Sequence, residues 1–253
     1  MPIDSHFYLY GVPAVILIGL AKGGFSGLGA LGTPLMVLGI ADPVKGAAIL
    51  LPILIAQDVV GVSAFRKTVD WHVIRVMLPG AAVGILLGYL LAAKVQETIV
   101  MAVLGAVTVA FGVYRLWIES GERIAASSTS PTWVGSLFGV AAGFTSQIAH
   151  AGGPPFQMWV MPRRLPRDTF VGTGAIFFAI INWIKVPAYV ALGQFTRDNL
   201  LATAVLLPVA VLASIAGVKL VRRFSSEKFY TIVYVLMLVA GAKLLWDGIV
   251  ATA

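Results

Sequence analysis

The chain has 253 residues, of which 59% are hydrophobic and 11% are charged, and it contains no cysteine. Soluble domains carry roughly 25% charged residues, so this composition argues against a disordered chain and against a water-soluble enzyme. The absence of cysteine excludes disulfides, thiolate metal sites and a cysteine nucleophile. The sequence therefore predicts an all-α, polytopic membrane protein.

The net charge of the chain is +7. A nucleic-acid-binding protein would carry such a charge on a basic stretch interleaved with aromatic residues, and no such stretch lies outside the apolar segments. We therefore assign the excess of basic residues to the flanks of membrane spans, where they set orientation. The predicted partner is the lipid bilayer, with no nucleic acid.

The first apolar region of the chain is interrupted. Residues 7–20 are apolar, residues 22–34 are rich in glycine, and residues 35–40 are apolar again. No lysine or arginine precedes this region and no small-residue cleavage pattern follows it, so we interpret it as a membrane segment rather than a signal peptide. The interruption predicts the two arms of a hairpin made from a broken helix.

Uninterrupted apolar segments follow, each near the ~20 residues that a membrane span needs. They lie at 44–65, 72–92 and 97–118. A linker-like stretch at 119–131 comes next, because it is rich in serine and ends in proline.

The second half repeats this layout. A second interrupted region has its apolar arms at 133–146 and 156–161, and the uninterrupted segments after it lie at 168–192, 199–221 and 227–250. Residues 79–88 also line up with residues 208–217, with Pro79 opposite Pro208 and Gly88 opposite Gly217. We predict one transport domain over residues 1–253, built from two divergent repeats at 5–118 and 132–250.

The distribution of lysine and arginine distinguishes two topologies. If each interrupted region is a hairpin that returns to its starting side, twelve lysines and arginines gather on one side and four on the other. If each region crosses once, the distribution is nine to seven. Basic residues favour the cytoplasmic side, so we predict hairpins, with both termini on the non-cytoplasmic side. Each repeat then has a broken-helix hairpin and three transmembrane helices, and the two repeats are inverted, as in secondary transporters.

Both hairpins carry a signal for a helix start. Thr33 can cap a helix that has Pro34 at its first position, and Gly153 precedes two prolines in the same way. Helix starts expose N–H groups and a partial positive charge, which bind anions. Two such starts facing each other predict an anion site. The alternative is that these glycines serve close helix packing, which is common in membranes.

Ionisable residues inside apolar segments are expensive and point to function. Lys22 and Lys185 could balance an anionic substrate, or their side chains could reach the membrane interface. Asp58 could carry a coupling proton, or it could be the structural partner of one of these lysines. His150, at the tip of the second hairpin, could contact the anion or relay a proton, or it could be a packing residue.

From these features we predict a set of substrate-binding residues and a smaller set for proton coupling. The substrate-binding set is Lys22, Gly23, Gly24, Ser26, Gly32, Thr33, Gln57, Gln147, His150, Gly152, Gly153, Thr173, Asn182 and Lys185. The proton-coupling set is Asp58 and His150. Since the three histidines are widely spaced and carboxylates do not cluster, we predict no metal and no cofactor.

The glycine motifs resemble those of a known family. The first hairpin contains Gly-Gly-Phe-Ser-Gly-Leu-Gly at 23–29 and Gly-Thr-Pro-Leu at 32–35, and the second contains Ala-Gly-Phe at 142–144 and Gly-Gly-Pro-Pro at 152–155. With Gly-Thr-Gly at 172–174, these motifs resemble the TauE/SafE family of sulfite and sulfonate permeases. The resemblance covers nearly the whole chain and implies export or uptake of sulfite, sulfonates or related sulfur oxyanions.

We therefore predict a secondary transporter, not an enzyme, that moves a small sulfur-containing anion across the bacterial inner membrane by alternating access. Coupling to a proton or cation and a homodimeric state are compatible with the sequence. Other classes stay open at this point: a channel, a non-transporting assembly factor, or an intramembrane enzyme that would use Asp58 with His150 as its acid–base pair.

Overall fold

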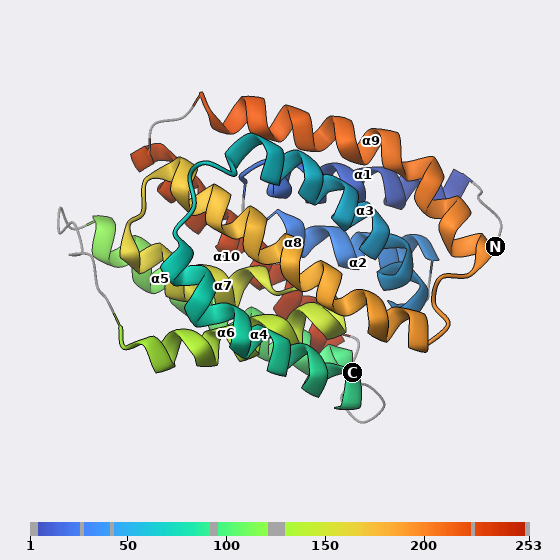
Figure 1. Ribbon diagram of the computed structural model, residues 1–253, viewed down its shortest axis with the longest axis horizontal. Coiled ribbons are helices and arrows are strands. Elements are labelled where there is room, and N and C mark those ends of the chain that lie inside the picture. The colour runs from blue at the N-terminus through green and yellow to red at the C-terminus, as the bar shows by residue number, and fades with distance from the viewer. Residues whose placement is uncertain are drawn as a thin grey trace.

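The computed structural model describes residues 5–25, 28–40, 43–91, 96–120, 130–223 and 226–250, and within these residues the chain is helical (Figure 1). The helices of the first half are α1 (Ser5–Lys22), α2 (Gly29–Ile40), α3 (Pro43–Phe65), α4 (Trp71–Leu91) and α5 (Glu97–Ser120). Those of the second half are α6 (Thr132–Ala149), α7 (Gly153–Val160), the short 3-10 helix η1 (Met161–Arg163), α8 (Arg167–Ala191), α9 (Arg197–Val221) and α10 (Ser226–Val250).

The predicted all-α membrane architecture is confirmed. In the described residues, helices long and apolar enough to cross a membrane are Ser5–Lys22, Lys45–Phe65, Trp71–Leu91, Arg167–Ala191 and Arg197–Val221. The apolar segments predicted at 97–118 and 227–250 form α5 and α10. Most of the linker predicted at 119–131 lies outside the described residues.

The start of α2 differs from the prediction. We expected Thr33 to cap the helix, but α2 begins at Gly29, so that Thr33 and Pro34 lie within it. Proline is a weak start signal here because helices in membranes tolerate internal proline, and α3, for example, contains Pro52. In the second hairpin Gly152 is the N-cap and α7 begins at Gly153, with proline in its first turn as predicted.

The closest helix crossings join the two halves through glycine. An added Cβ atom on Gly143 of α6 would lie 2.0 Å from the carbonyl oxygen of Ala81 in α4. One on Gly23, at the end of α1, would lie 2.5 Å from backbone atoms of Gly217 in α9. Small residues allow such close approach, which is a main source of helix association in lipid. The first arm of each hairpin therefore packs on a helix of the other half.

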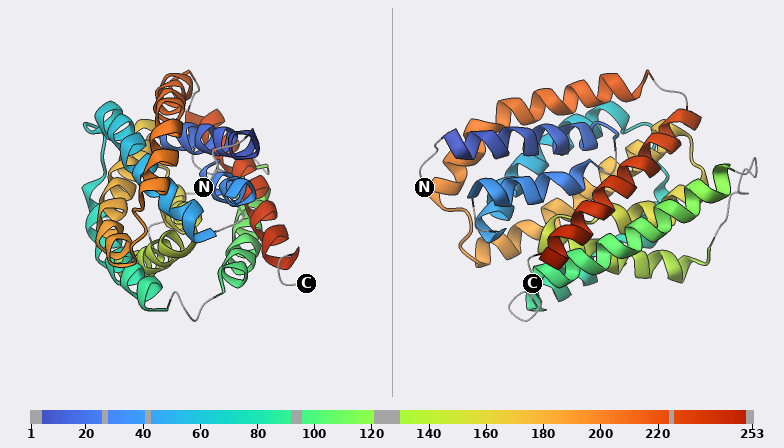
Figure 2. Two further views of the ribbon diagram at one scale, coloured as in Figure 1. Left: turned by 90° about the vertical axis from the view of Figure 1, so that its right-hand side faces the viewer. Right: turned by 180° about the vertical axis from the view of Figure 1, so that it is seen from behind.

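Corresponding helices of the two halves run antiparallel. Along α5, Gly105 faces Leu245 of α10 while Gly112 faces Leu238, so residue numbers rise along one helix as they fall along the other. Figure 2 shows these two helices side by side. The central helices α3 and α8 have the same relation, because Gly61 faces Ala175 and the more distal Phe65 faces Gly172. The inverted repeat stays a prediction, which these pairings support.

Candidate functional site

A cavity of about 110 Å³ lies where the two hairpins meet α3 and α8. Its walls come from the end of α1, the first turns of α2 and α7, the middle of α3, the end of α6 and one face of α8. The lining residues are Ile18, Ala21, Lys22, Gly24, Gly29, Thr33, Leu54, Ser146, His150, Ala151, Gly153, Pro154, Gln157, Val171, Gly174, Ala175, Phe178, Asn182 and Lys185.

Two helix starts border this cavity. Gly29 is the first residue of α2 and Gly153 is the first residue of α7, and both line it. The partial positive charge of each helix start therefore faces the same space. Proline has no N–H group, so among the first three residues of α7 only Gly153 can donate a hydrogen bond. The backbone at the start of α7 therefore offers few N–H donors to an anion, and side chains must supply the other hydrogen bonds.

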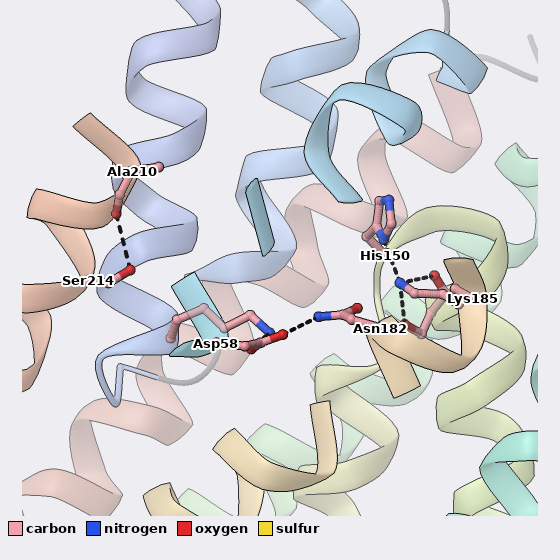
Figure 3. Close-up of polar contacts among 8 residues, drawn as sticks. Asp58, His150, Asn182, Lys185, Ala210 and Ser214 are labelled. Atoms are coloured by element: carbon pink, nitrogen blue, oxygen red, sulfur yellow. Dashed lines mark hydrogen bonds and ion pairs between the residues drawn. The ribbon is translucent and has the colours of Figure 1, made fainter. Parts of the chain in front are cut away.

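Lys185 is the most unusual residue of the cavity. Its side chain is 0% exposed, and its ammonium group lies 3.1 Å from the Ser146 hydroxyl, 3.3 Å from the Ser146 carbonyl oxygen and 2.9 Å from His150 Nδ1 (Figure 3). All three acceptors are neutral, and within the described part of the chain no carboxylate forms an ion pair with Lys185. Burying an ion without a counter-charge costs several kcal/mol. The site therefore favours an anion.

The protonation of His150 follows from its contacts. The residue caps the end of α6 in the left-handed region, at φ 50°, which turns the chain into the hairpin tip. Its Nε2 atom lies 3.0 Å from the carbonyl oxygen of Ala47, which can only accept, so Nε2 carries the proton. Nδ1 is then free to accept from Lys185. The ring also stacks on Tyr189 of α8, with centroids 6.2 Å apart.

Asp58 cancels the charge of the other lysine. Its Oδ1 atom lies 2.5 Å from the ammonium group of Lys22, and its Oδ2 atom accepts from the Asn182 amide at 2.6 Å. Asp58 is 4% exposed and joins α1, α3 and α8 through these two contacts. Lys22 and Lys185 both line the cavity, and Asp58 neutralises Lys22, so one positive charge remains for a ligand.

The structure gathers half of the predicted binding residues at one place. Those that line the cavity are Lys22, Gly24, Thr33, His150, Gly153, Asn182 and Lys185. They come from both hairpins and from α8, as expected for a site between two broken helices. Ser26 lies outside the described residues.

The other predicted residues in the described part of the chain do not line the cavity. They are Gly23, Gly32, Gln57, Gln147, Gly152 and Thr173. The Gln57 amide donates to the carbonyl oxygens of Val15 and Ala210, at 3.2 and 3.1 Å, and so holds α1 and α9 together. The Thr173 hydroxyl donates to the carbonyl oxygen of Thr169 at 2.6 Å, and accepts from the backbone of Asp70. Glycines 23, 32 and 152 instead allow close packing, since a Cβ atom on any of them would clash.

Gln157 is a cavity residue that the sequence analysis missed. It lies in the first turns of α7, is 2% exposed, and its Oε1 atom has no hydrogen-bond partner. Its Nε2 atom lies 3.8 Å from where a Cβ atom on Gly153 would be, so the side chain folds back toward the helix start. One feature of the sequence could have identified this residue as a candidate for the site: Gln157 is the one polar residue in the apolar arm at 156–161.

Part of the cavity wall is apolar. Ile18, Ala21 and Leu54 line it from the first half, and Val171, Ala175 and Phe178 line it from α8. The cavity therefore has a cationic, hydrogen-bonding end at Lys185 and an apolar wall. The ammonium group of Lys22, which is paired with Asp58, lies 5.3 Å from the centre of the Phe178 ring in that wall. Such a division suits a ligand with an anionic head and a small apolar part.

The family comparison agrees with this geometry. The family model described as "Sulfite exporter TauE/SafE" matches residues 12–244. The chain belongs to the TauE/SafE sulfite exporter family. Among curated proteins and among solved structures, no match to the chain was found. The resemblance drawn from the glycine motifs is confirmed, and the TauE/SafE chain is a membrane transporter of the sulfite and sulfur-anion class.

Proposed function

We propose that the cavity of this TauE/SafE protein binds a small organosulfonate, with the sulfonate oxygens directed at Lys185. The observation that carries this proposal is the complete burial of an ammonium group without a carboxylate partner among the described residues. An anion in the cavity would supply the missing counter-charge. The dipoles of α2 and α7, which start at the same cavity, would add to the attraction.

Neutral donors would orient the sulfonate group. Ser146 and Gln157 line the cationic end, and the Gln157 side chain already folds toward the start of α7. Thr33 approaches from α2, on the other side of the cavity. Hydrogen bonds from several directions suit a tetrahedral head with three equivalent oxygens. An anion of a different shape would bind more weakly, because some of these donors would then have no hydrogen-bond partner.

The apolar wall favours an organosulfonate over bare sulfite. A short alkyl group placed against Leu54, Ala175 and Phe178 would leave water, and each buried methylene contributes about 0.8 kcal/mol. Sulfite would leave this wall hydrated. The volume of about 110 Å³ limits the substrate to a small one.

We expect ethanesulfonate to bind the purified protein more tightly than sulfite, by about threefold to tenfold, because its ethyl group occupies the apolar wall. Calorimetric titration in detergent measures both affinities. A Phe178→Ala variant removes part of that wall and should reduce the preference, with the sulfite affinity changed less. Sulfite binding as tightly as ethanesulfonate would rule out the organosulfonate assignment, and binding of neither anion would rule out the site.

Transport would proceed by alternating access between two inverted repeats. The antiparallel packing of α3 on α8 and of α5 on α10 supports the inversion. The glycine crossings between α1 and α9 and between α4 and α6 hold the backbones of these helix pairs in close contact. A rocking movement would therefore carry α1 together with α9, and α6 together with α4, around the cavity between them.

Coupling to a proton would use the residues next to Lys185. A proton can pass along the 2.9 Å hydrogen bond between the Lys185 ammonium and His150 Nδ1 when the arrival or departure of the anion changes the local charge. Asp58 would act as the fixed counter-charge of Lys22, or would itself carry a coupling proton. Flux in proteoliposomes that is unaffected by collapse of the proton gradient would exclude this coupling.

We further propose a bacterial inner-membrane location with the ends of α3 and α9 in the cytoplasm, since Arg66, Lys67, Arg222 and Arg223 lie there. The absence of native cysteine makes single thiols informative. An exposed Lys67→Cys thiol should resist a membrane-impermeant maleimide in intact spheroplasts and react after lysis. A thiol at Gln194, in the loop between α8 and α9, should react in both. The reverse pattern would contradict this orientation.

A further inference from the structure

A second pocket lies at the end of the molecule where α3 and α9 finish and α8 begins. Its volume is about 280 Å³, and it is lined by Ser63, Ala64, Phe65, Arg66, Lys67, Thr68, Asp168 and Arg222. None of these residues lines the anion cavity. The three helices concerned are all apolar enough to span a membrane, so the pocket lies where the chain leaves the hydrocarbon layer.

The charge of this pocket is strongly positive. Arg66, Lys67 and Arg222 are exposed, and none of them forms an ion pair among the described residues. The one carboxylate of the pocket, on Asp168, is bound by Arg167 Nε at 2.8 Å. Three positive charges are therefore available to a ligand.

The Arg222 side chain is already positioned. Its Nη2 atom donates to the carbonyl oxygen of Ala64 at 3.1 Å, and its guanidinium lies 5.2 Å from the centre of the Phe65 ring. These contacts hold the planar group at the mouth of the pocket while other N–H groups stay available. A guanidinium fixed in this way suits the forked recognition of phosphate oxygens.

The surroundings favour a lipid over a free ion. Val59 lies one turn before Ser63 on α3 and is 63% exposed, and Leu220 of α9 is 41% exposed. Both precede the pocket residues on their helices, so they lie toward the membrane-spanning parts of α3 and α9, where an acyl chain would run. We propose that this pocket binds the phosphodiester headgroup of an anionic phospholipid. Basic pockets between membrane helices are recurring sites for such headgroups, and this site is independent of the anion cavity.

The proposal is tested by lipid binding to purified protein in detergent. Native mass spectrometry and thermal melting are recorded with phosphatidylglycerol, with phosphatidylcholine and with inorganic phosphate. Wild-type protein should retain phosphatidylglycerol and melt at a higher temperature with it. Phosphatidylcholine should bind at least tenfold more weakly, because its choline cation faces the arginines. Inorganic phosphate should give no stabilisation, since it has no acyl chain.

An Arg66→Gln/Lys67→Gln double variant should bind phosphatidylglycerol about thirtyfold more weakly. It should melt like wild type without lipid, because both side chains are exposed. The matched control is Arg75→Gln/Lys219→Gln, which removes two exposed charges outside the pocket and should stay within threefold of wild type. Unchanged binding by the double variant, an equal loss in the control, equal binding of phosphatidylcholine or equal protection by phosphate would each overturn the proposal.

Discussion

A Lys185→Gln variant is expected to lose sulfonate binding by about 30-fold or more, with transport falling below detection. Removing one partner of a buried, hydrogen-bonded charge pair costs about 2–5 kcal/mol, and Lys185 is the one charge of the cavity that the described residues leave uncompensated. Without ligand, the variant should melt no lower than wild type, because it no longer buries an unpaired ion. Calorimetric titration with ethanesulfonate and melting curves with and without that ligand measure both effects.

Two companion variants sharpen this result. Lys243→Gln removes a lysine from the partly exposed pair with Asp247 in α10, away from the cavity, and should bind and transport like wild type. His150→Gln retains an oxygen that can accept from Lys185, so it should weaken binding less than Lys185→Gln while reducing the dependence of flux on the proton gradient. Sulfonate affinity in Lys185→Gln equal to that of Lys243→Gln would refute the role of Lys185.

The second large effect is expected at the crossing of α4 and α6. A Gly143→Ala variant places a methyl group 2.0 Å from the Ala81 carbonyl oxygen and within 2.8 Å of two further backbone atoms. A backbone carbonyl cannot rotate away from the methyl group as the end of a flexible side chain can. The helices α4 and α6 must therefore move apart. We expect a loss of about 3 kcal/mol in the free energy of unfolding, seen as a large drop in melting temperature and in the yield of folded protein.

Gly153→Ala is the matched control for this effect. The same methyl group there would approach nothing closer than the Gln157 amide at 3.8 Å. Its melting temperature should therefore stay near that of wild type, although the residue borders the cavity and ligand affinity can change. Equal stability of the two alanine variants would contradict a close crossing of α4 and α6 at Gly143.

Membrane physics made most of the fold predictable. Lipid cannot satisfy backbone N–H and C=O groups, so long apolar segments must be helices, and the segments predicted at 44–65 and 199–221 agree with α3 and α9 within a few residues. The error at α2 arose because proline marks helix starts in water more reliably than in membranes, where neighbouring helices compensate for its missing N–H group.

The site was only partly predictable. Hydropathy singled out Lys22, Asp58, His150 and Lys185, because ionisable residues stand out in apolar segments. Gln157 escaped attention because a glutamine is neutral and common, and nothing in its neighbours shows that it faces a cavity. Gln57 and Asp58 are adjacent in sequence, yet one joins α1 to α9 and the other faces α8.

By itself the sequence determined the family, the helices and the group of ionisable residues inside the apolar segments, and it predicts a two-fold repetition of the layout. The tertiary structure alone decided which lysine Asp58 neutralises, and it is Lys22 rather than Lys185. Helical periodicity determines which face of its own helix a side chain occupies. Charge compensation depends on atoms a few ångströms apart on helices distant in sequence. Only the packing of α1, α3 and α8 therefore shows which positive charge remains for the substrate.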